Sequence, residues 1–444
     1  MKIAIINSKT DPAGVNIREH LLSKLNLSEN DSKKYTRYFS HELIFYEAEE
    51  RLIYQSSIDS AFDSDLIIFI SRHSSQNPVP ALTVHVTGNY GTAMLGGSDK
   101  ELACSSPDYM HLVLNELFKR APDGFKSSYE VTHHGPTDLK TPSFFVEIGS
   151  TESEWMNEDA GNAVAGSILE ALKKDRPKTI NLVGFGGNHY AARETEIALS
   201  SKGAFGHIAH TREVSGLSRE MIKQMIEKSF ADGAYIDKKA LQSNDVLKIE
   251  KILNELSIPL LSEGEIKDIG DLSWEKYQEI AKIALEACPF CKIRIGGMKG
   301  FGTPVLIEIM PELFEEAYKV DEKNMAKAIN RICAVSFISQ KGRILPIFIT
   351  YEENRIQTIN DLISLCVKTL HKDKDTAVID DSLVIRKIRF DPAKAAELGV
   401  LKGPFYGKLA AGFDIVVGGR TITPAMVSKS SEKVIRIPGL ENYL

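Results

Sequence analysis

The stretch INLVGFGGNHYAARETEIA, residues 180–198, joins an apolar strand pattern to a helical pattern through a glycine-rich turn. The same alternation fills the first half of the chain. Its other strand runs are KIAII (2–6), LIIFI (66–70), ALTVHV (81–86), YEVTH (129–133) and FFVEI (144–148), and its helical patterns lie near 107–120, 158–173 and 189–199. Apolar strands alternating with helices of this length predict an α/β fold with a mostly parallel central sheet, covered on both faces.

The second half of the chain has a different character. A helical stretch from Ser218 to about Ile258 leads into a polar segment, 260–276, that contains two glycines and indicates a domain boundary. We therefore expect one domain over residues 1–270 and an accessory domain of unknown role over 271–444. The latter reads as α+β and ends in a hairpin that turns at Gly418-Gly419.

Composition places further bounds on function. The chain has 444 residues, 43% of them hydrophobic, and a formal net charge of -6. That charge gives no global attraction to nucleic acid, so any RNA contact must use a local basic patch. Five cysteines, an odd number, fit a reducing compartment better than a disulfide framework. No apolar run approaches the roughly 20 residues of a membrane helix, and we expect a cytoplasmic, soluble protein.

Histidines mark the region where chemistry is expected. Ten of the eleven lie at or before His210, and histidine is the side chain best suited to proton transfer and metal binding near neutral pH. Five of them lie at or near the ends of predicted elements: His73, His85, His133, His134 and His189. For any single one a structural role competes with a functional one, and His207 and His210 are weak candidates. Together they favour a hydrolytic site, with or without metal.

Other polar residues accompany these histidines. Glu147 lies in an apolar strand, where a carboxylate is costly to bury unless it is paired, binds metal or has a raised pKa. Arg72 could hold an anion or a carbonyl. Asn188 is a plausible N-cap, and the backbone donors near Gly186 and Gly187 would suit an oxyanion.

Several of these segments resemble the archaeal and plant type of D-aminoacyl-tRNA deacylase. The matching blocks follow one another over most of residues 1–215: SRHSS, PALTVHVTGN, VTHHGPT, FFVEIGSTE, GFGGNHYAARETE and FGHIA. Asn188 and Ala192 depart from the pattern, where glycine and proline are usual. The resemblance implies a phosphorylase or peptidyl-tRNA-hydrolase-like core, hydrolysis of the ester between a D-amino acid and tRNA, and an association with zinc. In the second half, LGVLKGPFYGKLAAG (398–412) resembles a segment of tRNase Z enzymes.

These expectations define a candidate site. The catalytic candidates are His133, His134, Glu147 and His189; the substrate-binding candidates are Arg72, Thr87, Asn89, Gly186 and Gly187; and the candidate zinc ligands are His73, His133, His134 and Glu147. We expect aminoacylated tRNA as the partner, no membrane or DNA, and a monomer. Two alternatives remain open: a tRNA-binding module with a structural metal, and an enzyme resembling peptidyl-tRNA hydrolase or nucleoside phosphorylase.

Overall fold

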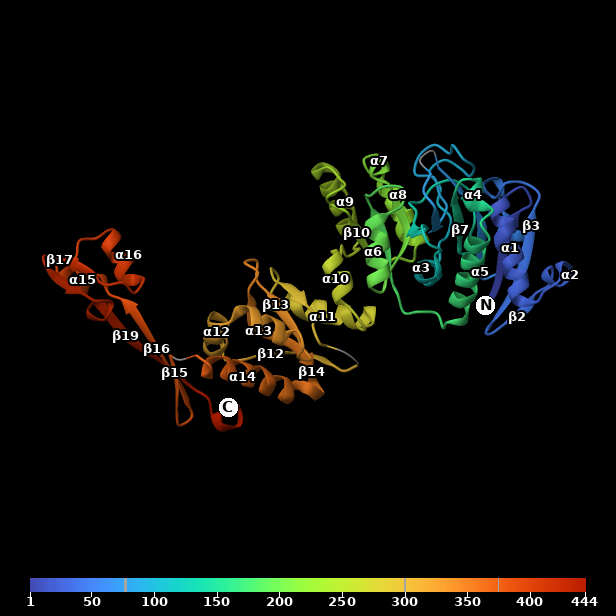
Figure 1. Cartoon of the computed structure of the whole chain (residues 1–444). Coiled ribbons are helices and arrows are strands. Elements are labelled where there is room, and N and C mark those ends of the chain that lie inside the picture. Colours follow the sequence, from blue (N-terminus) through green and yellow to red (C-terminus); the bar gives the residue numbers. More distant parts are fainter. Residues whose placement is uncertain (76–77, 299–300, 374) are drawn as a thin grey trace. The chain divides into compact units, whose positions relative to one another are not determined.

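The computed structural model describes residues 1–75, 78–298, 301–373 and 375–444. The chain divides into two compact units, Met1–Trp274 and Glu275–Leu444 (Figure 1). None of the helices in these described ranges has the length and apolar character that crossing a membrane requires.

The main sheet of the first unit has seven strands in the order β2-β3-β1-β4-β7-β5-β6. Their bounds are β1 Lys2–Ser8, β2 Thr36–Tyr38, β3 His41–Ala48, β4 Leu66–Ser74, β5 Ala81–His85, β6 Lys126–Tyr129 and β7 Ser143–Ser150. β1 pairs in parallel with β3 and β4, and β4 with β7, whereas β2 and β5 run antiparallel to β3 and β7. The prediction of a mostly parallel central sheet is therefore confirmed. The predicted strand 129–133 is wrong beyond Tyr129, where β6 ends.

Three long helices pack against this sheet. α1 (Pro12–Leu25), α5 (Glu158–Lys173) and α3 (Pro107–Arg120) contact one another in that order, and each also contacts strands of the sheet. The β4 run from Leu66 to Ile70 is fully buried, which explains its continuous hydrophobic sequence. Two short helices, α2 (Glu29–Ser32) and α4 (Glu152–Trp155), complete this layer.

A second, smaller parallel sheet lies in the same unit. It contains β8 (Ile180–Phe185), flanked by β9 (Gly203–Ala209) and β10 (Gly233–Ile236). Its helices are α6 Ala192–Ser200, α7 Thr211–Val214, α8 Arg219–Lys228, α9 Ser243–Glu255 and α10 Glu263–Asp268. The stretch 218–258 is mainly helical, as expected, and β10 within it is a buried four-residue strand too short to show a period of its own.

The second unit is α+β. An antiparallel sheet of β11 (Lys292–Arg294), β13 (Val335–Ile338), β14 (Ile344–Tyr351) and β12 (Pro304–Glu308) accompanies α11 (Trp274–Ala287), α12 (Pro311–Val320), α13 (Glu322–Ile329) and α14 (Arg355–His371). A second sheet contains β15 (Thr376–Ile379), β16 (Ser382–Phe390) and β19 (Ser428–Arg436). Cys288 and Cys291 form a disulfide, and the other three cysteines are free.

Between β16 and β19 the chain forms a small lobe, residues 391–427. The lobe contains α15 (Pro392–Glu397), α16 (Pro404–Ala410) and a hairpin of β17 (Ile415–Val417) and β18 (Arg420–Ile422). The hairpin turns at Gly418-Gly419, as predicted, and both glycines have the positive φ that such a turn requires. The six buried core residues of the lobe form a hydrophobic cluster of their own.

Candidate active site

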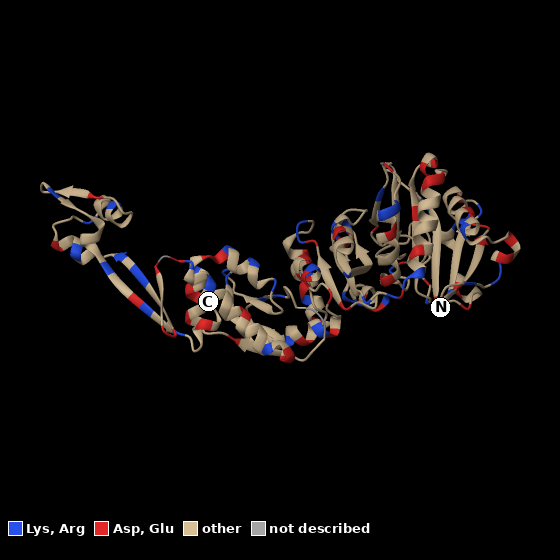
Figure 2. Cartoon of the chain, turned by 60° about the horizontal axis from the view of Figure 1, so that its bottom comes forward, with Lys and Arg blue, Asp and Glu red and all other residues tan. Residues whose placement is uncertain are grey.

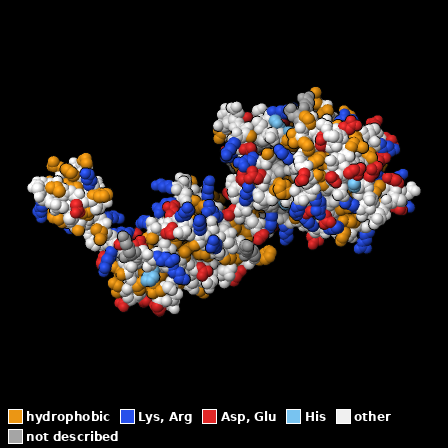
Figure 3. All heavy atoms as spheres, viewed as in Figure 1, with side chains coloured by type: hydrophobic (Ala, Val, Ile, Leu, Met, Phe, Trp, Pro, Cys, Tyr) orange, Lys and Arg blue, Asp and Glu red, His pale blue; other side chains and the backbone are white. Residues whose placement is uncertain are grey.

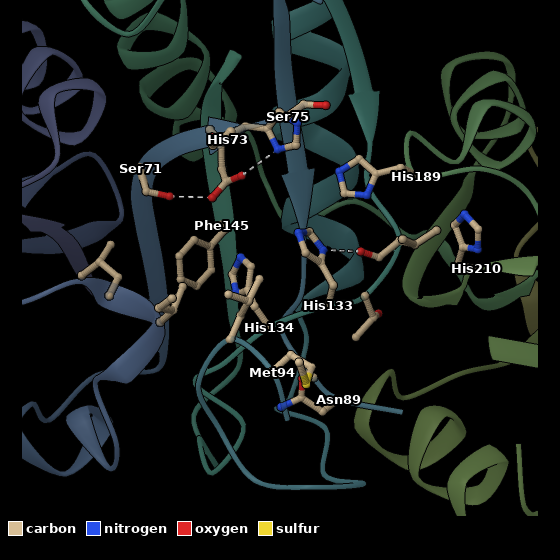
Figure 4. A pocket seen from close by; sticks show the side chains of 18 of the residues that line it. Ser71, His73, Ser75, Asn89, Met94, His133, His134, Phe145, His189 and His210 are labelled. Carbon is tan, nitrogen blue, oxygen red and sulfur yellow. Dashed lines mark hydrogen bonds and ion pairs between the residues drawn. The ribbon is translucent and has the colours of Figure 1, made fainter. Parts of the chain in front are cut away.

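A pocket of about 930 Å³ lies in the first unit and is lined by most of the histidines singled out above (Figure 4). Strand register explains part of this convergence. Ser71 pairs with Glu147 and His85 with Phe145 on neighbouring strands. Paired residues point to one face of a sheet, and so do residues two apart on a strand. His73 therefore shares a face with Ser71, Glu147 and His85.

The segment that follows β6 connects the two sheets and carries a carboxylate, Glu130, between them. The Glu130 amide still donates to Val84 of β5, at 3.1 Å. The next amide, that of Val131, donates to the His189 carbonyl at 2.9 Å, and the Thr132 amide donates to Ile208 of β9 at 2.9 Å. This change of partner brings the loops after β6 and β8 together and fixes Glu130 at their junction.

His133 and His134 are adjacent in sequence, yet both reach the pocket. In a regular strand, adjacent side chains point to opposite faces. His134 instead has a left-handed φ of 48° immediately before Gly135, and the two ring centroids are 4.5 Å apart. The turn at the glycine therefore allows both imidazoles to converge, as the sequence suggested.

Glu130 is the centre of the histidine cluster, although it is not itself among the residues that line the pocket. Its side chain has no exposed surface, and three imidazoles surround it: His189 Nε2 lies 3.0 Å, His73 Nδ1 3.2 Å and His133 Nε2 3.6 Å from its oxygens. Among the described residues, neither oxygen has a hydrogen-bond partner of good geometry. Burial raises the pKa of Glu130, but the hydrogen bond of His189 and the nearby imidazoles of His73 and His85 outweigh it and hold that pKa well below its usual range.

Glu147 is a second buried carboxylate, held in place by its neighbours. Ser71 Oγ donates to its Oε1 at 2.6 Å. Its Oε2 lies 3.7 Å from both His85 Nε2 and His73 Nδ1. Burial raises the pKa of Glu147, and the imidazole of His85 outweighs it and lowers that pKa. The ionised form of both carboxylates, Glu130 and Glu147, is therefore favoured.

Backbone carbonyls orient three of the imidazoles. His133 Nδ1 lies 2.8 Å from the Val131 carbonyl, and His134 Nδ1 lies 2.7 Å from the Gly135 carbonyl. His85 Nδ1 makes the same kind of contact, 3.2 Å from the Val86 carbonyl. A carbonyl can only accept, so each Nδ1 carries a proton and each Nε2 is directed elsewhere.

Electrostatics separates His85 from the other two. Burial, reinforced by neighbouring imidazoles, lowers the pKa of His133 well below its usual value and that of His134 to about 4. Both are therefore neutral at pH 7, with an Nε2 lone pair free to accept a proton or bind a cation. Burial also lowers the pKa of His85, but the carboxylates of Glu147 and Glu130 outweigh it and raise that pKa.

The donor atoms fit a metal ion. Three groups of side chains in the described part of the chain have ligand atoms within 4.8 Å of one another: His85 with His133 and His134; His73 with Glu130 and His189; and His85 with Glu130 and Glu147. Among the residues that the structure describes, the buried His85 Nε2 and Glu130 oxygens have no hydrogen-bond partner of good geometry, and a cation would satisfy them. Imidazole and carboxylate are ligands of zinc. The four ligands proposed from sequence all border the pocket but fall into different groups.

Of the substrate-binding candidates, two line the pocket and the others lie outside its lining. Arg72 lines the pocket, with its guanidinium 5.1 Å from the Trp155 ring centroid. Asn89 also lines it, and its amide nitrogen donates to the Gly96 and Ser98 carbonyls. The Thr87 hydroxyl donates to the Pro136 carbonyl and is buried. Asn89 and Thr87 thus support the pocket wall.

The glycine turn after β8 differs from its predicted role. The Gly186 amide donates to the Ala209 carbonyl and the Gly187 amide to Thr211 Oγ1, so neither is free for an oxyanion. The predicted N-cap Asn188 is wrong, because α6 begins later and its N-cap is Ala191. The glycines instead hold the loop that carries His189.

Sequence reasoning missed Glu130 and left His85 unassigned. The signal for Glu130 was present, because it stands in the run YEVTH just as Glu147 stands in FFVEI. Of the weak candidates, His207 is buried against Thr132 and the Ala103 carbonyl, outside the pocket lining. His210 caps α7 and lines the pocket.

A buried cluster of histidine and glutamate side chains in an open pocket of an α/β protein defines a site for hydrolytic chemistry. The family model for D-aminoacyl-tRNA deacylase matches residues 60–261. A D-aminoacyl-tRNA deacylase of Methanoculleus marisnigri is 46% identical over 444 residues, covering 100% of both chains. The chain therefore belongs to the D-aminoacyl-tRNA deacylase family.

Shorter proteins match only part of the chain. A D-aminoacyl-tRNA deacylase of Archaeoglobus fulgidus is 39% identical over 258 residues, which are 56% of this chain and 91% of that protein. A crystal structure titled as a conserved protein of unknown function is similar with a TM-score of 0.54 and 34% identity, over 60% of this chain and 96% of that one.

Proposed function

We propose that this protein hydrolyses the ester bond of D-aminoacyl-tRNA and releases a free D-amino acid and tRNA. The observation that carries the proposal is the convergence of the imidazoles of His73, His133 and His189 on the buried carboxylate Glu130, beside a pocket of about 930 Å³ that these three imidazoles line. Membership of the family identifies the substrate class. The central sheet is consistent with a core like that of peptidyl-tRNA hydrolase.

Ester hydrolysis requires a proton acceptor, a group that stabilises the oxyanion and a proton donor. The oxygen of water bonds to the carbonyl carbon as a proton passes to a base, and the bond to the ribose oxygen then breaks as that oxygen receives a proton. The neutral Nε2 of His133 or His134, or the Glu147 carboxylate, would take the first proton. His189, 3.0 Å from Glu130 and partly exposed, would deliver the second. Arg72 would face the oxyanion.

We propose that zinc binds among these donors. His85, His133 and His134 would hold it through their Nε2 atoms, with His73, Glu130, His189 and Glu147 as the neighbouring donors. When bound, zinc would act as a Lewis acid that polarises the ester carbonyl or acidifies water. The carbonyl contacts of the Nδ1 atoms would orient these ligands.

The pocket wall should make the enzyme stereospecific. Asn89 and the Gly135 amide donate to carbonyls of the segment 95–98, which holds the backbone of this part of the pocket lining in place. A rigid wall rejects one arrangement around the α-carbon by steric clash. With matched D- and L-tyrosyl-tRNA we expect kcat/KM to favour the D-ester by at least about 100-fold. Equal rates would indicate a general esterase and contradict the proposal.

We propose that the first unit carries the chemistry and the second serves as an accessory. All site residues lie within Met1–Trp274, and a shorter relative of the same name is matched by 56% of this chain. A fragment of residues 1–274 should therefore retain a kcat within about 10-fold of the full chain, with circular dichroism confirming its folding. A folded fragment that is inactive at saturating substrate would place part of the chemistry in the second unit.

A further inference from the structure

The second unit contains a segment whose charge is opposite to that of the rest of the chain. Residues 386–436, which comprise the outer part of β16, the small lobe and β19, contain ten Lys and Arg against four Asp and Glu. This segment is therefore net positive by six, in a chain with a formal net charge of -6 (Figure 2). Clustered positive charge in an acidic protein is typical of a surface for a polyanion.

Strand register arranges part of this charge as a stripe. β15 pairs with β16 only as far as Ile385, so Arg386–Phe390 pairs with β19 alone and forms a two-stranded ribbon. Arg389 lies opposite Lys429, Lys387 opposite Ser431, and Ile385 opposite Lys433. Because the side-chain period of a strand is two, the four basic side chains of these pairs lie on one face of the ribbon. We call Lys387, Lys433, Arg389 and Lys429 the cationic stripe.

The inner half of the stripe already binds an anion. Glu316 of α12 makes ion pairs with Lys387 and, at 3.3 Å, with Lys433. Burial raises the pKa of Glu316, but these lysines and Lys319 outweigh it and lower that pKa to about 2. A carboxylate so strongly stabilised shows that this face of the ribbon favours a negative oxygen.

The outer half of the stripe has no such anion. Within the described part of the chain, neither Arg389 nor Lys429 makes an ion pair of 4.0 Å or less, and both are exposed. Like charges directly opposite each other in an antiparallel ladder are destabilising. Their placement is therefore a cost to the ribbon that an external anion would remove.

The lobe beyond the ribbon adds charge and exposed rings. Lys402, Lys408 and Arg420 are exposed there, and the Phe413 side chain is 64% exposed. The space-filling view shows hydrophobic and basic side chains at the surface of this lobe (Figure 3). Such a surface suits a nucleic acid, because basic side chains bind phosphates and exposed aromatic rings stack on bases.

We propose that the cationic stripe and the adjoining lobe bind the sugar-phosphate backbone of tRNA, with Arg389 and Lys429 each contacting phosphate. The inference rests on the proposed function for the identity of the RNA, since aminoacylated tRNA is the polyanion that function requires. It gives the second unit a role in affinity, and its contacts are sequence-independent because they address phosphate.

The test compares the full chain with the double variant Arg389→Glu/Lys429→Glu. Uncharged tRNA is the probe in a binding titration at several salt concentrations, so the result does not depend on deacylation. We expect Kd to rise at least about 10-fold and the salt slope to fall by about 2, one unit per lost phosphate contact. The KM for D-tyrosyl-tRNA should rise in parallel.

Two further proteins complete the design. The exposed lysines Lys282 and Lys341 lie in the same unit outside the segment, so Lys282→Glu/Lys341→Glu matches the charge change and should bind tRNA like the unsubstituted chain. If the double reversal unfolds the ribbon, Arg389→Gln/Lys429→Gln removes the same contacts with less repulsion and should weaken binding in the same direction.

Three outcomes decide the proposal. Equal tRNA affinity in the folded variants and the unsubstituted chain overturns it. So does binding to phosphatidylglycerol vesicles without binding to tRNA, which would identify a membrane surface instead. Variant-sensitive tRNA binding by a chain that fails to deacylate D-tyrosyl-tRNA supports the inference and rejects only the proposed function.

Discussion

Replacing Glu130 with glutamine is expected to lower kcat/KM for D-tyrosyl-tRNA by at least about 100-fold. Three imidazole nitrogens lie within 3.6 Å of this carboxylate, and the two nearest, His189 Nε2 and His73 Nδ1, favour its charged form and lower its pKa. Glutamine keeps the volume but removes the charge and presents an amide that would donate toward His189. The proton donor His189 and any bound cation would both lose the Glu130 carboxylate as a neighbour.

Glu116→Gln is the matched control. Glu116 is also a buried carboxylate, but it lies on α3 among Lys119, Arg120 and Lys174 and outside the pocket. Its replacement should affect stability, seen as a change in Tm, more than turnover. Comparable losses of kcat/KM in both variants would show that Glu130 acts through folding alone and would contradict its place in the site.

Glu130 also shows where sequence reasoning failed. The run YEVTH predicts a continuous strand, and its less apolar sequence gives Glu130 less emphasis than FFVEI gives Glu147. In the structure β6 ends at Tyr129, and the next three residues change partner from β5 to the loop after β8 and to β9. That change depends on contacts between segments some 50 to 80 residues apart, which no local pattern encodes.

Other parts of the fold could be predicted because their signals are local. The strand runs near 2–6, 66–70 and 144–148 are strongly apolar, and the helices at 107–120 and 158–173 have clear apolar faces. The direction of β5 could not be predicted, since pairing is set by tertiary packing. For the same reason, the histidines could be grouped by type but not sorted into the sets that the register and the turn at Gly135 create.

Under the zinc proposal, exhaustive chelation should reduce activity to below roughly 1% of the starting value, and added zinc should restore it. Without a cation, the His85 Nε2 and Glu130 oxygens are buried with no hydrogen-bond partner of good geometry among the described residues. Metal content measured before and after chelation accompanies each activity assay. Full activity in a preparation shown to be metal-free would exclude the zinc proposal while leaving the deacylase proposal intact.

His133→Ala separates binding of the cation from proton transfer. Under the zinc proposal it should lower both turnover and metal content, since His133 belongs to a group of three imidazoles whose ligand atoms lie within 4.8 Å of one another. If His133 serves only as a base, turnover falls and metal content does not. His111→Gln is the control, because His111 hydrogen-bonds to carbonyls of Ala198 and Ser201 outside the pocket. That variant should keep its metal, so a loss there would trace the effect in His133→Ala to altered folding.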